Sequence, residues 1–155
     1  MHGALIEAWY TNNRINLFLI GQITAAGMKC TLSKRGGRNV AQQFAHMHTN
    51  RVWQLEKRAK DLSAGLRKFE GKVTPTKAEL KKAFNTSGAA VETFLSDVLA
   101  GEPRRRGFKK GIFTTLGYFI AHESHHRGNI LLTLKECGHK IDKKSEYVLW
   151  GWDQM

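Results

Sequence analysis

The sequence lacks long apolar runs, a secretion signal and closely spaced cysteines. Its apolar runs are short and broken by polar residues, which excludes a membrane-spanning segment. Residues 1–9 have neither the basic start nor the cleavage site of a signal peptide. Cys30 and Cys137 are the only cysteines and form no Cys-x-x-Cys motif, so we interpret both as reduced packing residues. These absences together predict a cytoplasmic protein.

Negative charge is also scarce. The chain has 25 Lys and Arg residues against 13 Asp and Glu residues, a formal net charge of +12. The basic residues are spread along the chain in short groups, at 34–38, 57–58, 81–82, 104–110 and 143–144, and no motif for DNA or RNA recognition accompanies them. We therefore expect solvated surface charge and no nucleic-acid partner. The length of 155 residues fits one domain over residues 1–155.

Apolar residues recur at helical spacing in four long stretches. The pattern predicts helices over residues 4–24, 40–62, 76–100 and 112–137. Asn39 is the expected N-cap of the second helix, and Thr76 with Glu79 forms a capping box at the start of the third. Gly138 follows the fourth helix as its expected C-cap.

The connections between these stretches predict the fold. Residues 61–75 form a long link between the second and third helices, and no strand is indicated. Four helices with one long crossover predict an all-α four-helix bundle. The tail, residues 139–155, holds Tyr147, Trp150 and Trp152, and we expect a tail so rich in aromatic residues to be docked on the bundle.

The fourth helix contains the most informative motif of the chain. Three of the seven histidines fall within residues 122–126, and His122 and His126 are four residues apart. On a helix this spacing puts both imidazoles on one face, where they can bind one metal ion. The alternative is a pair of core histidines that are hydrogen-bonded to neighbouring helices. In the second helix His46 and His48 are both candidates for a third ligand, and His48 lies on the apolar stripe.

These motifs resemble the DinB/YfiT-like family. The resemblance rests on His-x-x-x-His-Arg-Gly-Asn-Ile at 122–130, Val-Ala-Gln-Gln-Phe-Ala-His-Met at 40–47 and Tyr-Val-Leu-Trp-Gly-Trp at 147–152. It implies an up-down-down-up four-helix bundle, often a homodimer. It also implies a divalent metal on three histidines, here His46, His122 and His126. His46 is preferred to His48 because the family ligand follows a hydrophobic-Ala step.

The resemblance implies several functions. Three imidazoles leave a coordination position open, which is typical of catalytic rather than structural sites. Zinc or nickel is the expected metal, since imidazole suits both. A metal-dependent S-transferase that uses a low-molecular-weight thiol, or a hydrolase, is the expected enzyme. The alternative is a non-catalytic metal-binding module of a stress or DNA-damage response.

Several neighbouring residues are candidates for supporting roles. His48, His125, Arg127, Asn50 and Tyr118 are expected to support the metal ligands or to line a pocket. Arg127 is expected to bind a thiolate or carboxylate substrate, with a structural ion pair or a dimer contact as its alternative. Glu123 is expected either to support a metal ligand or to form a surface or interhelix salt bridge off the ligand face. Asn12 and Asn16 line the pocket or form hydrogen bonds inside the bundle, and Gly128 is expected to permit close helix approach.

The predicted helix register puts the three histidines nearer to the end of the bundle that carries the loop of residues 33–38. We expect Lys34, Arg35 and Arg38 in this loop to steer an anionic substrate toward the metal.

Overall fold

Four long helices form the bundle, and the all-α fold class is confirmed. The computed structural model describes residues 2–155. The long helices are α1 (His2–Gln22), α3 (Val40–Arg58), α5 (Lys77–Leu99) and α6 (Ile112–Glu136). Three short α-helices and a 3-10 turn accompany them: α2 (Ala25–Met28), α4 (Lys60–Ser63), α7 (Lys143–Val148) and η1 (Trp152–Gln154). Within residues 2–155 there is no strand, and no helix is long and apolar enough to cross a membrane.

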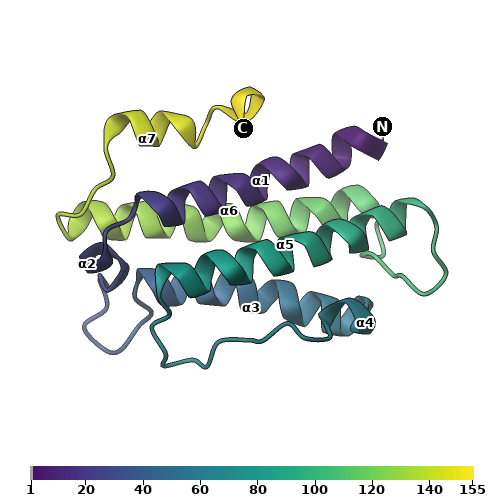
Figure 1. Cartoon of the computed structure of the whole chain (residues 1–155), viewed down its shortest axis with the longest axis horizontal. Coiled ribbons are helices and arrows are strands. Elements are labelled where there is room, and N and C mark those ends of the chain that lie inside the picture. Colours follow the sequence, from purple (N-terminus) through teal and green to yellow (C-terminus); the bar gives the residue numbers. More distant parts are fainter. Residues whose placement is uncertain (1) are drawn as a thin grey trace.

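The crossover between α4 and α5 sets the direction of the helices. Figure 1 shows that this segment runs back along the length of the bundle, so that α3 and α5 point the same way. Helices α1 and α6 point the opposite way, which gives the up-down-down-up order. As a result α3 and α6 are antiparallel neighbours. The N-terminal end of α3 and the C-terminal end of α6 therefore lie at the same end of the bundle (Figure 1).

Local sequence accounts for most helix boundaries. Asn39 caps α3 through its side chain, which accepts from the Gln42 backbone N–H at 2.8 Å. Thr76 and Glu79 form the predicted capping box at the start of α5. The second predicted helix ends earlier than expected, at Arg58 instead of residue 62, because Ala59 leaves helical geometry with φ −155° and ψ 62°. The single turn of α4 follows that break.

Helices α1 and α5 approach each other closely at Gly88. The indole N–H of Trp9 donates to the Gly88 carbonyl at 3.0 Å. A Cβ at Gly88 would lie 2.5 Å from Asn13 Nδ2, so a larger residue would displace that side chain. The expectation of close approach at Gly128 was wrong, because Gly128 is exposed and has no neighbouring atom within 4 Å of a Cβ position.

The tail docks on the bundle through aliphatic residues. Ile141 and Leu149 are buried in a core cluster that includes residues of α1, α3, α5 and α6. The hydroxyl of Ser145 also donates to Gln22 Oε1 of α1 at 3.2 Å. The tail is docked as predicted, but Tyr147 and Trp150 are 66% and 79% exposed and do not hold it there. Ile141 and Leu149 lie on either side of α7, and Ser145 is the one buried residue within that helix.

Candidate metal centre

Three histidines converge between α3 and α6. The ring centroid of His46 lies 5.3 Å from that of His122 and 4.8 Å from that of His126, and the two α6 rings are 4.7 Å apart. One nitrogen from each ring lies within 4.8 Å of the others. All three side chains are half-buried, at the rim of the bundle. We call His46, His122 and His126 the histidine triad.

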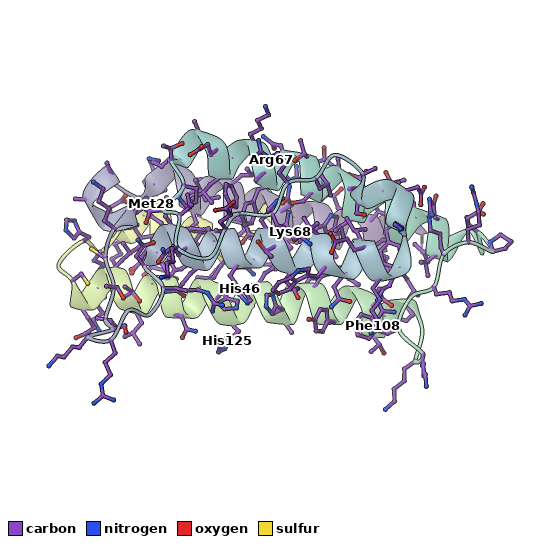
Figure 2. All side chains as sticks on the ribbon, turned by 90° about the horizontal axis from the view of Figure 1, so that it is seen from below. Met28, His46, Arg67, Lys68, Phe108 and His125 are labelled. Atoms are coloured by element: carbon purple, nitrogen blue, oxygen red, sulfur yellow. The ribbon has the colours of Figure 1, made fainter. Side chains whose placement is uncertain are left out.

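Helix geometry explains which histidine of α3 joins the triad. Residues two apart on a helix differ by about 200° in direction, so His46 and His48 face different neighbours. Figure 2 shows His46 on the side of α3 that faces α6. His48 faces α5 and the crossover, where its Nδ1 lies 3.0 Å from Ser87 Oγ and its Nε2 2.9 Å from the Arg67 carbonyl oxygen. Both ring nitrogens of His48 therefore have protein partners.

A buried ion pair joins α3 to α6 beside the triad. Arg51 of α3 donates from Nε and Nη2 to the two carboxylate oxygens of Glu123, at 2.6 and 2.9 Å. Both side chains are almost fully buried. Glu123 thus forms a salt bridge between helices, one of the expected alternatives. Arg51 was not singled out in the sequence, where only its position among apolar residues of the second helix could have drawn attention to it.

Two asparagines and Arg127 extend this network. Asn12 and Asn16 of α1 donate to Glu123 Oε2 at 2.7 and 2.6 Å. Their carbonyl oxygens accept from Arg127 Nη1, each at 2.8 Å. Arg127 therefore faces α1 inside the bundle. It follows His126 of the triad in the sequence, but its side chain points to a different neighbour. Asn12 and Asn16 form hydrogen bonds inside the bundle, the second of their two expected roles.

The network keeps the Glu123 carboxylate charged. Burial alone would raise the pKa of Glu123, but the positive charges of Arg51 and Arg127 and the hydrogen bonds from Arg51 and Asn12 lower it below its usual value. Burial lowers the pKa of Arg127, and the Glu123 charge opposes that effect. A buried carboxylate is stable only with such compensation. The ionised pair therefore acts as a fixed link between α3 and α6.

Polar and aromatic side chains surround His122. Asn50 Nδ2 lies 3.3 Å from His122 Nδ1, and the Tyr118 hydroxyl lies 3.1 Å from Asn50 Oδ1. The Tyr118 ring stacks on His122, with centroids 6.0 Å apart and an interplanar angle of 18°. Gln54 Nε2 donates to the Tyr118 hydroxyl at 3.3 Å. Asn50 and Tyr118 therefore contact the triad directly. Gln54 joins them, and no motif or periodicity in the sequence singles it out.

Two further residues border the triad on the solvent side. His125 is exposed, and Figure 2 shows it pointing away from the bundle. Its Nε2 lies 3.1 Å from Asn129 Nδ2, and its ring is 5.2 Å from that of His126. Trp53 is 50% exposed, and its ring centroid lies 6.3 Å from that of His46. Trp53 was not predicted, because a tryptophan on an amphipathic helix usually indicates core.

The triad is neutral at neutral pH. Burial, the Arg38 charge and His122 lower the pKa of His46 to about 4. Burial and the neighbouring histidines, with His125 and Arg38, lower the pKa of His126 to about 4. The pKa of His122 is also lowered, chiefly by burial. A neutral imidazole keeps a lone pair for a metal, so these shifts favour metal binding over proton binding.

The depressed pKa values predict how the stability of the metal-free protein depends on pH. An unfolded histidine titrates near 6.5, whereas folded His46 and His126 titrate at about 4. The unfolded chain therefore binds more protons between these values, and the free energy of unfolding falls as pH falls from 6.5 toward 4. Thermal melts of metal-free protein between pH 7 and 5 should show this decline. The double variant His46→Asn, His126→Asn should show a smaller slope, and an equal slope would mean that the triad does not cause it.

Comparison with known proteins gives one match. The family model described as DinB family matches residues 1–145, a range that contains the whole triad and the Arg51–Glu123 pair. No curated protein and no solved structure matches the chain.

Proposed function

The chain belongs to the DinB family, and we propose that the histidine triad binds one divalent metal ion. The observation that carries this proposal is the convergence of three ring nitrogens within 4.8 Å of one another. Within residues 2–155 the rings of His46 and His126 have no hydrogen-bond partner, and that of His122 has one at Nδ1 only. Neutral imidazoles with free lone pairs that face one another are suited to a shared cation.

The ligand set favours a borderline metal such as zinc or nickel. Imidazole nitrogens bind zinc, nickel, copper and iron, whereas carboxylate and carbonyl oxygens are preferred by magnesium and calcium. Glu123, the nearest carboxylate in sequence, is committed to Arg51 and the asparagines of α1. The site is therefore an all-nitrogen site as far as protein ligands are concerned.

Metal content after substitution tests the ligand assignment. His46→Ala, His122→Ala and His126→Ala should each abolish stoichiometric zinc or nickel, because each removes one of three ligands. The matched control is His125→Ala, which removes an exposed neighbouring histidine and should leave the metal in place. His48→Gln should also leave it, since His48 contacts Ser87 and Arg67 instead. Metal analysis of the purified variants gives the answer, and full metal in the His46→Ala protein would refute the assignment.

Asn50 is the second part of the proposal, as the residue that positions His122. The side-chain amide of Asn50 fits its surroundings equally well when its oxygen and nitrogen exchange places. The oxygen then faces His122 Nδ1 and the nitrogen faces the Tyr118 hydroxyl, so that both contacts are kept. The amide oxygen then accepts the Nδ1–H proton, which leaves the lone pair of His122 on Nε2. Such a partner fixes the tautomer and the ring direction of a ligand histidine.

Variants at Asn50 test this positioning role. Asn50→Leu has a similar shape but accepts no hydrogen bond, and it should weaken metal affinity by about ten- to a hundredfold. Asn50→Asp retains an acceptor oxygen and should restore the affinity. Competition with a chelator of known affinity measures both values. If Asn50→Leu binds metal as tightly as the unchanged protein, Asn50 has no such role.

For the reaction, we propose transfer of a low-molecular-weight thiol to an electrophilic carbon. A metal on three imidazoles has room for a further ligand and lowers the pKa of a thiol bound there. Trp53 and Tyr118 border the site with aromatic surface. Arg38, which acts on the pKa of both His46 and His126, brings positive charge to it. These features support a carboxylate-bearing thiol as cosubstrate, guided by the loop that also carries Lys34 and Arg35. A homodimer and a cytoplasmic location stay predictions.

An S-transfer assay separates this function from the alternative of a non-catalytic metal-binding module. Metal-loaded protein, a thiol such as glutathione, cysteine or coenzyme A, and the probe 1-chloro-2,4-dinitrobenzene should give the thioether, chloride and a proton faster than the uncatalysed mixture. His122→Ala should reduce the rate to background, and His125→Ala should not. Stoichiometric metal without acceleration for any thiol would favour the non-catalytic module. That result would contradict the proposed reaction but not the proposed metal binding.

A further inference from the structure

The fold brings the two cysteines together at one end of the bundle. Cys30 lies just after α2, and Cys137 directly follows α6. Cys137 Sγ is 3.9 Å from the carbonyl oxygen of Thr31, the residue next to Cys30. Both cysteines are free thiols and half-buried, so a small reagent can reach them. Burial and the adjacent Cys137 side chain raise the pKa of Cys30, which agrees with this proximity.

The backbone around Cys30 is held in place. The Val40 N–H donates to the Cys30 carbonyl at 2.9 Å, and Thr31 Oγ1 donates to the Arg38 carbonyl at 3.2 Å. These two hydrogen bonds close the base of the loop formed by residues 31–39. Cys30 also packs against the core cluster that contains Met28 and Leu134. The Cys30 backbone is therefore held at the base of the loop, beside the first residue of α3.

Cys137 occupies the corresponding point on α6. Its backbone N–H donates to the Thr133 carbonyl at 3.0 Å and ends the helix. Helix α6 carries His122 and His126, and α3, whose N-cap is Asn39, carries His46. Figure 1 shows that the segment after α2 and the C-terminal end of α6 lie at the same end of the molecule. A covalent link between the cysteines would tie together the ends of the two helices that bear the triad.

We propose that Cys30 and Cys137 are an oxidation site that closes to an intramolecular disulfide in the presence of a low-molecular-weight disulfide. The Cys137 thiolate attacks one sulfur of the reagent and expels one thiolate, which leaves a mixed disulfide on Cys137. The Cys30 thiolate then attacks the Cys137 sulfur and expels the second thiolate. The two cysteine protons pass to solvent or to the released thiolates. The protein loses two electrons, and the reagent is reduced to two thiols.

This oxidation does not depend on metal at the triad. Neither cysteine belongs to the triad, and the bond would form at the end of α6, beyond Thr133. It would restrict the unfolded chain, because it joins residues that are far apart in sequence. The oxidised protein should therefore unfold at a higher temperature than the reduced protein. The S-transfer reaction proposed above and this oxidation can fail separately, since they use different residues and different readouts.

The experiment uses the full chain, first reduced and freed of reductant. The folded protein is treated with oxidised glutathione, quenched with acid, unfolded and alkylated, and its free thiols are counted by intact mass. The expected product has no free thiol and no glutathione, and peptide mapping should join the Cys30 and Cys137 peptides. Its melting temperature should rise and return to the starting value after treatment with dithiothreitol.

Two single variants provide the matched controls. Cys30→Ser should stop at a mixed disulfide on Cys137, and Cys137→Ser should give no internal bond and no rise in melting temperature. Two glutathione adducts on the unchanged protein would overturn the proposal, because they would show that the sulfurs do not meet. Two unreacted thiols or a disulfide-linked dimer would overturn it as well.

Discussion

The buried ion pair between Arg51 and Glu123 determines how α3 and α6 face each other. Removing two charges from water is costly, so the pair is stable only in the one helix arrangement that satisfies both groups. At about 100° per residue, His122 and His126 lie about 100° and 60° to the same side of Glu123. By the same count His46 and Asn50 lie about 140° and 100° to one side of Arg51. Fixing the pair therefore directs these side chains into the same space.

The histidine triad depends on this arrangement for its chemistry as well as its geometry. Arg51, Asn12 and Asn16 all donate to the Glu123 carboxylate, so it is not available as a metal ligand. The imidazoles are left half-buried at the rim, where burial keeps them neutral and solvent can still reach them. The buried Arg51–Glu123 ion pair thus lies next to a neutral histidine site that ligands can reach.

The structural features that follow from local sequence could be predicted. The capping residues Asn39 and Thr76 define where two long helices begin, and the spacing of His122 and His126 puts them on one helix face. The choice of His46 needed the family resemblance. The apolar stripe marks the most buried positions of α3. His48 lies on this stripe and is hydrogen-bonded inside the bundle. His46 lies at the rim, off the stripe, so periodicity alone does not select it.

The remaining features depend on contacts between distant segments, which periodicity does not encode. The partner of Arg51, the proximity of Cys30 and Cys137 and the aliphatic docking of the tail all require the packed bundle.

The most direct test of metal binding by the histidine triad is X-ray absorption at the zinc edge of protein loaded with one equivalent of zinc. Binding by the histidine triad predicts an imidazole shell with zinc–nitrogen distances of about 2.0–2.1 Å and no sulfur ligand. A shell with sulfur at about 2.3 Å, or one with oxygen ligands and no imidazole, would contradict it.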